Sequence, residues 1–350
     1  MSTVFRPADA ATTGGKITLA DLAARTGLNI STVSRALSKP ERVSAETRKL
    51  VRRAAEQLGY ATNLAARSLS RGRADMFMVV LSNFPGQPIS PVLTEALRGV
   101  FDEAAQRGYG VIIKRVEYAE LAVEELMDLA LNGMVDGVLM LAPARSARTV
   151  RRIRPPAHIP VVSVMHDMVA GGISSVVALE QAGFYGLTDY LLRKGHRHFA
   201  FLSGLVDTTH EKLRFEGVMQ RLAEEGMADA CDLLPGGAFD MESGLKAVPH
   251  FLSLENRPTA VICCSDALAL GFIRGALKAG LRIPQDVAVS GYDGLEQGEY
   301  STPTLTTLIQ PSAEIGRLAT RLLIDRCQQH QATPPQLVAL GTMLAERESA

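Results

Sequence analysis

The 350-residue sequence predicts an α/β protein: a small all-α domain at the N-terminus, followed by a two-lobed body built on parallel sheets. Three observations support this prediction. The chain is too long for one ordinary hydrophobic core, which favours two or three domains. Residues 1–75 carry a net charge of +7 and the remainder −7, although the whole chain is neutral. From Met76 onward, short apolar runs alternate with amphipathic helical patterns.

The composition is that of a folded protein, with 47% hydrophobic and 21% charged residues. No apolar run is long enough to cross a membrane, and residues 1–15 lack the pattern of a secretory leader. The cysteines show no CxxC or metal-ligand spacing, and Cys263 and Cys264 lie in an apolar run, which favours buried reduced thiols. We therefore expect a cytoplasmic protein without a metal or a cofactor.

The N-terminal region contains three helical patterns with their start and stop signals. Thr18, with an acid three residues later, matches a capping box, and Gly27 ends the first pattern. Asn29 can begin a second helix that runs to about residue 37. Ser44 begins a third helix, which ends at Gly59 and whose inner face is apolar: Leu50, Val51, Ala54, Ala55 and Leu58.

Two short helices joined by a three-residue turn and packed against a third are typical of a helix-turn-helix unit. The second helix of such a unit fits the DNA major groove, and its N-terminal residues face the base edges. Here that surface carries Ile30, Ser31, Ser34 and Arg35. Arg35 suits guanine or a phosphate, whereas Ile30 offers only apolar contact to a thymine methyl.

The predicted DNA-binding surface also includes Thr18 and a set of polar or basic residues suited to phosphates: Thr32, Lys39, Arg42 and Ser44. The alternative is a three-helix packing module with a solvated basic face. We favour DNA binding because the cap, the turn and the basic residues coincide.

Strand-length apolar runs alternate with helical patterns along the body, in two series. The first has strands near 77–81, 111–116, 137–141 and 161–165, with helices near 91–108 and 121–132. The second has strands near 175–177, 199–202, 260–264 and 287–290, with helices near 184–193, 212–225, 243–252 and 267–279. This alternation indicates two lobes with parallel sheets, which usually bind ligands at the carboxyl ends of the strands.

The body carries no sequence motif of catalysis. No Gly-rich phosphate loop, GxSxG turn or HExxH helix follows the predicted strands. His196 and His198 suggest a metal site, but they stand directly before a strand, which favours a structural turn. Cys264 and His166 are the remaining weak candidates for a reactive group, and we expect no enzyme activity.

Three stretches of the N-terminal region resemble the LacI/GalR family of bacterial transcription regulators: TLADLAARTGLNISTVSRALS, VSAETRKLVRRAAEQLGY and NLAARSLSRGR. The body resembles the family's effector domain, which has the fold of periplasmic sugar-binding proteins. The matching stretches are LLRKGHRHFAFLSG, EKLRFEGVMQRL, PTAVICCSDALALGFIRGALKAGLRIPQDVAVSGYDGLE and YSTPTLTTLIQPSAEIGRLA. The resemblance implies a homodimeric regulator, most often a repressor, which binds double-stranded operator DNA under the control of a small-molecule effector, without a membrane partner.

The resemblance further implies that residues 63–70 form a hinge helix that folds only when two protomers bind an operator. A helix of eight residues is too short to be stable alone in water. Asn63 can cap this helix, and Ala66 allows two hinge helices to approach closely. Leu69 matches the leucine that the family inserts into the minor groove. Without the resemblance, Leu69 would be an ordinary linker residue.

The resemblance also assigns contacts to an effector between the lobes. Arg214 matches an arginine that hydrogen-bonds ligand hydroxyls, Asp293 an acceptor carboxylate, and Ser265 a polar contact where the family usually has asparagine. Ile89 and Ser90 match the opposite wall. An arginine and a carboxylate suit a polyol, although an ion pair within one lobe is the alternative for both.

One departure from the family leaves the effector class open. Leu179-Glu180 stands where many sugar-responsive members have an Asp-Asn pair, and Ala178, a further candidate contact, precedes it. Within the sugar class, the loss of these polar groups disfavours an unmodified hexose or pentose, and it leaves open a sugar acid, a sugar phosphate or a less polar metabolite. For such ligands, His166 and Arg115 are additional candidate contacts.

The expected domains are a DNA-binding domain over 1–62, a hinge and linker over 63–74, and an effector domain over 75–345. Its N-terminal lobe is expected at about 75–171 and 299–326, and its C-terminal lobe at about 172–298 and 327–345. The chain would then cross between lobes near Gly171, Glu299 and Arg326. A binding protein of a transport system is the alternative function, but it would need export and would lack residues 18–72.

Overall fold

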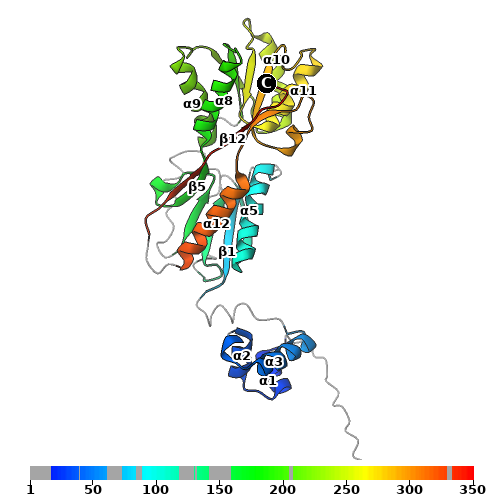
Figure 1. Cartoon of the computed structure of the whole chain (residues 1–350), viewed down its shortest axis with the longest axis vertical. Coiled ribbons are helices and arrows are strands. Elements are labelled where there is room, and N and C mark those ends of the chain that lie inside the picture. The colour runs from blue at the N-terminus through cyan, green and yellow to red at the C-terminus, as the bar shows by residue number, and fades with distance from the viewer. Residues whose placement is uncertain are drawn as a thin grey trace, which may run out of the picture. The chain divides into compact units, whose positions relative to one another are not determined.

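The computed structural model describes residues 17–38, 40–60, 73–83, 89–117, 130, 132–141, 159–204, 208–328 and 333–350. The chain divides into two compact units, Met1–Ala74 and Asp75–Ala350. The first unit is helical and the second contains two α/β lobes (Figure 1). Within the described ranges, no helix is both long and apolar enough to cross a membrane.

The first unit packs three helices, α1 (Leu19–Thr26), α2 (Ile30–Ser38) and α3 (Ala45–Leu58), with a short 3-10 turn η1 (Pro40–Arg42). Gly27 and Gly59 end α1 and α3 at φ 69° and 65°, a conformation that glycine adopts without steric cost. Six buried side chains form the core: Leu22, Ala23, Val33, Ala36, Val51 and Ala54. Leu50 was expected on this inner face but is 47% exposed, because neighbouring helix positions are about 100° apart and Val51 takes the inward one.

The N-lobe is built on a parallel six-stranded sheet in the order β11-β5-β4-β3-β1-β2. Its strands are β1 (Met76–Asn83), β2 (Gly110–Glu117), β3 (Gly137–Leu141), β4 (Val161–Val164), β5 (Ser174–Ala178) and β11 (Leu337–Leu340). Side chains of β1 alternate between two apolar clusters, one on each face, so the sheet is buried on both sides. Helices α5 (Pro91–Arg107) and α12 (Ser312–Gln328) pack together over one face (Figure 1), and a 3-10 turn, η2 (Val169–Gly171), precedes β5.

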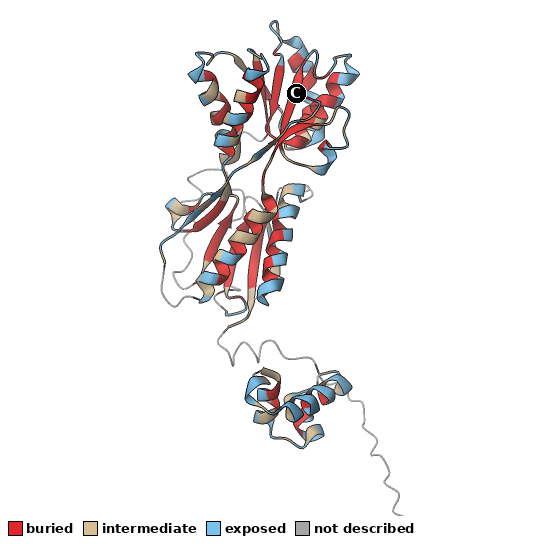
Figure 2. Cartoon of the chain, in the orientation of Figure 1, coloured by how far each residue is buried: buried red, intermediate tan, exposed pale blue. Residues whose placement is uncertain are grey.

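The C-lobe is built on a second six-stranded sheet in the order β12-β10-β9-β8-β6-β7, with only β12 antiparallel. Its strands are β6 (Phe199–Ser203), β7 (Cys231–Pro235), β8 (Ala260–Cys263), β9 (Ala288–Asp293), β10 (Thr306–Ile309) and β12 (Met343–Ala345). Two helix pairs flank it, α8 (Glu180–Arg193) with α9 (Thr209–Glu224), and α10 (Met241–Ser253) with α11 (Asp266–Lys278), and η3 (Glu296–Gly298) follows β9. The central strands β6, β8 and β9 are buried, whereas the edge strands β7 and β12 are mostly half-buried or exposed, and the helices expose their outer faces (Figure 2).

The first crossing between the lobes lies later in the chain than expected. β5 pairs with β4 and with β11, so it belongs to the N-lobe and does not begin the second series. The crossing therefore follows Ala178, and the predicted position near Gly171 is wrong. A short apolar run looks the same in either sheet, because its sheet is decided by pairing with a strand about 160 residues away.

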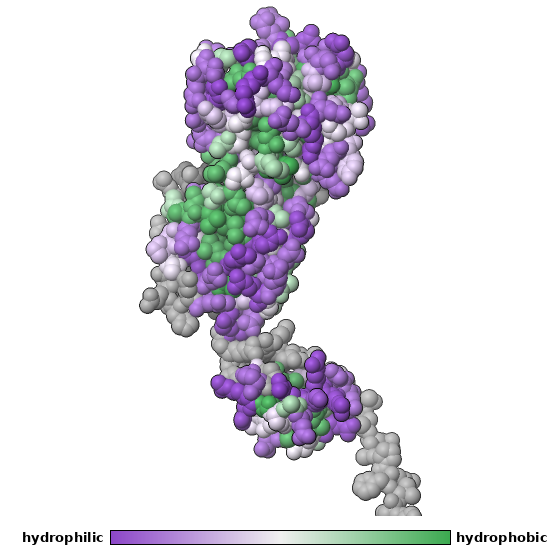
Figure 3. All heavy atoms as spheres, in the orientation of Figure 1, coloured by the Kyte–Doolittle hydropathy of each residue, from purple (hydrophilic) through white to green (hydrophobic). Residues whose placement is uncertain are grey.

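The other two predicted crossings, near Glu299 and Arg326, are wrong for the same reason. β10 pairs with β9 in the C-lobe, so the second crossing follows Ile309. The third lies between β11 in the N-lobe and β12 in the C-lobe. In the space-filling view, apolar surface gathers around β5 and the region where the lobes meet (Figure 3).

A glycine allows close backbone contact in each helix pair of the two lobes. A Cβ at Gly316 of α12 would overlap the carbonyl oxygen of Ala96 in α5. Gly217 of α9 meets the carbonyl of Gln181 in α8 in the same way, and Gly271 of α11 lies against α10. These close approaches fix how each pair covers its sheet, which in turn fixes the sheet edge where the lobes meet.

We expect Gly316→Ala to lower the free energy of unfolding by about 1–3 kcal/mol, because the added methyl group forces α12 away from α5. The measurement is urea denaturation of the full chain followed by circular dichroism. Gly186→Ala in α8 is the matched control, because no atom lies within 4 Å of the added Cβ. The control should stabilise the chain by about 0.5–1 kcal/mol. Equal effects of the two substitutions would contradict this account of the helix pair.

Candidate functional site

The start of α2 exposes the residues predicted to read DNA bases. Ile30 is 53% exposed, and Ser31 and Arg35 are also exposed, while Ser34 is half-buried. Val33 and Ala36 hold the opposite face of α2 in the core. The helix therefore presents one mixed apolar, hydroxyl and cationic face to solvent.

The residues predicted to contact phosphates have different surroundings. Thr18 forms the predicted capping box: its hydroxyl accepts from the amide of Asp21, whose carboxylate accepts from the Thr18 amide at 2.8 Å. Ser44 caps α3 by accepting from the Thr47 amide at 3.2 Å. Thr32 is half-buried and Arg42 is exposed. Lys39 and the hinge candidates Asn63, Ala66 and Leu69 lie outside the described residues.

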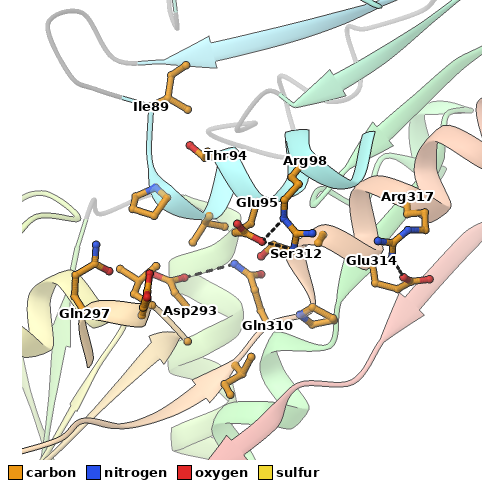
Figure 4. Close-up of a pocket in the computed structure, with 18 residues that line it drawn as sticks. Ile89, Thr94, Glu95, Arg98, Asp293, Gln297, Gln310, Ser312, Glu314 and Arg317 are labelled. Atoms are coloured by element: carbon orange, nitrogen blue, oxygen red, sulfur yellow. Dashed lines mark hydrogen bonds and ion pairs between the residues drawn. The ribbon is translucent and has the colours of Figure 1, made fainter. Parts of the chain in front are cut away.

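The body contains a pocket of about 800 Å³ where α5 and α12 of the N-lobe face the end of β9 in the C-lobe (Figure 4). Ile89 and Asp293, both predicted effector contacts, line it. At its base, Gln310 Nε2 donates to Asp293 Oδ1 at 3.5 Å. At its edge, Arg98 donates to Glu95 within α5 at 2.6 Å, and α12 contributes further charged side chains. Of the predicted effector contacts, Ile89 and Asp293 alone line this pocket.

Ser90 and Ser265 occupy equivalent positions in opposite lobes. Ser90 is the N-cap of α5, and its hydroxyl accepts from the Leu93 amide at 3.3 Å. Ser265 is the N-cap of α11 and accepts from the Leu268 amide at 3.3 Å. Each hydroxyl retains its own O–H, so a cap residue can still donate to a ligand.

Arg214 lies on α9, buried, and is paired with Glu180. Its Nε and Nη2 donate to Glu180 Oε1 at 3.1 and 2.6 Å, and its Nη1 donates to the Cys264 carbonyl at 2.5 Å. Its guanidinium carbon lies 4.1 Å from the centre of the Tyr292 ring. Burial alone would lower the pKa of Arg214, but Glu180 together with Tyr292, Asp293 and Cys264 raises that pKa above its usual value.

Glu180 is the first residue of α8, directly after the first crossing between the lobes. Its Oε2 contacts His210 Nδ1 at 2.7 Å, and His210 Nε2 lies 3.3 Å from Nδ1 of His166 in the N-lobe. Burial alone would raise the pKa of Glu180, but Arg214 and His210 together lower it to about 2. Glu180 is therefore ionised at neutral pH, and His210 links it to His166 of the N-lobe.

Three further acids lie close by: Glu211 and Asp266 are buried, and Asp293 is half-buried. Burial raises the pKa of Asp293 well above its usual value and also raises the pKa of Glu211. Burial raises the pKa of Asp266 to about 6, although this carboxylate accepts from the Thr307 hydroxyl and the Leu295 amide. Glu180, Asp293 and Glu211 are therefore close enough to interact with the charge of Arg214, whereas Asp266 interacts with Asp293.

Four predicted contacts do not line the first pocket, namely Ser90, Arg214, Ser265 and Ala178. Ala178 lines a second pocket of about 550 Å³ on the α8–α9 side, together with Glu180, His166 and His210. Arg115 is exposed on the edge strand β2 and lines neither of these two pockets.

The side chains that suggested other chemistry have structural partners. His196 contacts the Thr259 hydroxyl at 2.9 Å, and His198 lies 3.0 Å from Asp232. Cys263 and Cys264 are buried free thiols, as predicted, and burial raises the pKa of both. Among the described residues, no group of three or more His, Cys, Asp or Glu side chains could hold a metal ion.

Sequence reasoning missed three members of the buried network, namely His210, Tyr292 and Gln310. One local signal was present: His210 and Arg214 are four residues apart on a predicted helix, which places them on one face. Tyr292 and Gln310 gave no such signal, because they meet only when β9 and β10 pair.

A helix-turn-helix unit joined to a two-lobed body with polar groups between its lobes defines a class, the DNA-binding regulators with a ligand-binding domain. Residues 18–63 match bacterial regulatory proteins of the lacI family, and residues 188–350 match a periplasmic binding protein-like domain. The HTH-type transcriptional repressor CytR of Escherichia coli (strain K12) is 30% identical over 327 residues, which cover 92% of this chain and 93% of that protein. The chain belongs to the lacI family. It is a DNA-binding transcriptional repressor with an effector-binding domain, and not an enzyme.

Two solved structures are similar to the chain over nearly its whole length. The Lac repressor dimer bound to operator and the anti-inducer ONPF superimposes with a TM-score of 0.83 at 24% identity, covering 96% of this chain and 99% of that one. The complex of the transcriptional regulator CelR with cellobiose has a TM-score of 0.69 at 29% identity, covering 95% and 100%. The predicted fold class, a helical N-terminal unit plus two mainly parallel α/β lobes, is confirmed.

We expect Glu180→Gln to lower the free energy of unfolding by about 3 kcal/mol at pH 7, because it leaves Arg214 without its counterion. The pKa of Glu180 is lowered on folding, so its contribution is complete above about pH 4.5. The contribution is then lost as the pH falls to about 2. Urea denaturation of the wild type and the variant at several pH values measures the difference.

The control for this prediction is Glu242→Gln, which alters an exposed carboxylate on α10. It should change stability by less than about 0.5 kcal/mol at any pH. A Glu180→Gln deficit that stays constant from pH 7 down to the acid limit would contradict the assignment of the ion pair.

Proposed function

We propose that this repressor binds a roughly palindromic operator as a homodimer and that a small sugar-type effector between its lobes sets its affinity for DNA. The observation that supports DNA reading most directly is the exposed start of α2. Ile30 is a large apolar side chain left in water at the first position of a helix, beside Ser31 and Arg35. Such a surface fits a major groove, where an apolar group meets a thymine methyl and an arginine meets guanine.

In this proposal, Ser34 completes the base-reading face. Phosphate contacts from Thr18, Thr32, Lys39 and Arg42 fix the register of the unit on the duplex without reading sequence. One such unit covers only a half-site, so two protomers are needed for a full operator.

The segment 63–70 carries the second part of the proposal. Asn63, Ala66 and Leu69 belong to a hinge helix that is too short to persist alone, so pairing with its partner's copy on DNA supplies its stability. Leu69 enters the minor groove at the operator centre and kinks the central base step. The Lac repressor, which shares this fold, is bound to its operator as a dimer.

The effector contacts in this proposal come from both lobes. Arg214, Ser265 and Asp293 present the C-lobe wall, Ile89 and Ser90 the N-lobe wall, and Ala178 lies at the first crossing. The CelR relative, 29% identical to this chain, is solved with cellobiose. Hydroxyl groups suit a wall of buried donors and acceptors, because each finds a charged or neutral hydrogen-bond partner.

Effector control follows from the three crossings between the lobes. A ligand that contacts both walls changes the angle between the lobes. It changes DNA affinity only when it binds the two angles unequally, because tight but equal binding shifts nothing.

We expect Arg35→Ala to lower operator affinity by about 1–3 kcal/mol and to relax selectivity at one base position in each half-site. An operator is first selected from random duplexes, and equilibrium binding is then measured on single-base variants. Arg42→Ala is the matched control: it should weaken binding to all sequences similarly and flatten the salt dependence. Uniform protection of random DNA by the wild type, with no selected site, would rule out sequence-specific reading.

We expect the effector and the operator to change each other's affinity by the same factor, because thermodynamic coupling is reciprocal. A thermal-shift screen over sugars identifies a ligand, since binding to the folded state alone raises its melting point. Calorimetry then gives the affinity for that ligand with and without operator. A ligand that binds with unchanged affinity in both conditions would not be the effector.

A further inference from the structure

The guanidinium expected to bind effector hydroxyls is already neutralised within the protein. Arg214 directs Nε and Nη2 at one oxygen of Glu180, and both side chains are buried, with 8% and 4% of their surfaces exposed. Contacts with described residues engage three of the N–H groups of Arg214, whereas a guanidinium has five. The others remain able to donate to a neutral oxygen.

The groups around this pair leave no uncompensated positive charge. Asp293 lies at the end of β9 and Glu211 on α9, close enough that both influence or respond to the charge of Arg214. The Tyr292 ring covers one face of the guanidinium, and the Cys264 carbonyl accepts from its Nη1. His210 contacts Glu180, and His166 contacts His210.

We infer that the effector is an uncharged, hydroxyl-bearing molecule, and that Glu180 excludes anionic analogues such as sugar acids and sugar phosphates. This inference rests on the proposed role of the cleft as the effector site. It removes the sugar acids and the sugar phosphates from the effector classes that the sequence leaves open.

The physical reason is the cost of a second anion beside a satisfied ion pair. An anionic ligand has two ways to bind, and both cost free energy. It can displace Glu180 from Arg214, which leaves a buried carboxylate without its partner, or it can lie beside Glu180, where two negative charges repel in a poorly solvated site. Burial already raises the pKa of Asp293 and of Glu211, so this wall disfavours negative charge even on its own side chains. A hydroxyl group carries no such cost, and it can use the free donors of Arg214 and the lone pairs of Glu180.

The exclusion of anions depends on the residue type at position 180 and not on the fold itself. Glu180 follows β5 and begins α8, where a side chain points at α9 across the helix pair. A neutral residue at this position removes the counterion, which lowers stability, and frees the guanidinium. Specificity for neutral ligands therefore depends on one side chain.

The first test uses the wild-type full chain and matched ligand sets: glucose, glucuronate and glucose 6-phosphate, and ribose, ribonate and ribose 5-phosphate. Dissociation constants come from calorimetry. The tightest ligand in each set should be the neutral sugar, with each anion at least about tenfold weaker. An anion that binds as tightly as its neutral counterpart, or more tightly, would overturn the inference.

The second test removes the carboxylate and asks for a gain of binding. Glu180→Gln keeps the side-chain shape and one acceptor oxygen but frees the charge of Arg214. Its affinity for inorganic phosphate and for glucuronate should rise at least about tenfold over the wild type. The control Glu242→Gln, an exposed carboxylate on α10, should match the wild type. No gain in a folded Glu180→Gln protein would overturn the inference.

Glu180→Asn provides a second variant with a shorter amide, which keeps the test decisive where the glutamine variant does not fold. Operator binding is measured separately for every variant by footprinting. A protein that binds no operator refutes the proposed function, whereas normal operator binding with a preference for anionic ligands refutes only the role assigned to Glu180.

Discussion

The burial of one positive charge organises the centre of this protein. Arg214 stacks on Tyr292 away from water, and a buried guanidinium remains charged only beside a counterion or a set of acceptors. Glu180 supplies that counterion from the start of α8, and the Cys264 carbonyl supplies an acceptor from the end of β8. These contacts hold α9 against the ends of β8 and β9 and the start of α8. The C-lobe residues proposed to bind the effector are therefore preorganised before a ligand binds.

The rest of the architecture keeps that wall rigid within each lobe and leaves movement to the crossings. Buried parallel sheets and glycine-mediated helix pairs resist deformation, because an interior packed to crystal density has no space to absorb a shift. The chain passes between the lobes after Ala178, after Ile309 and between β11 and β12, and His210 contacts His166 from one lobe to the other. A ligand that bridges the walls therefore changes the angle between two rigid bodies.

The local patterns were sufficient to predict most helices and strands, because capping residues and apolar periodicity are written in short segments. The capping box at Thr18 and the buried runs at β6 and β8 are examples. Sheet membership was predicted wrongly for β5, since it depends on β11, which lies far along the chain. The site shows the same limit. The resemblance indicated Arg214 and Asp293, but the pairing of Arg214 with Glu180 joins residues 34 positions apart on different helices. No periodicity encodes such a contact.

The two oxygens of Glu180 connect effector recognition with the geometry of the lobes. Oε1 accepts from Arg214 in the effector wall, and Oε2 contacts His210, whose other nitrogen reaches His166 of the N-lobe. A ligand hydroxyl that accepts a hydrogen bond from Arg214 weakens the bond between Arg214 and Oε1. The negative charge on the carboxylate then redistributes toward Oε2, which changes the contact with His210. Hydrogen bonds in a chain polarise one another at low dielectric, so the interlobe contact between the two imidazoles depends on what occupies the arginine. Under the proposed function, we expect substitutions at this position to change the accepted ligand and the balance between lobe angles together.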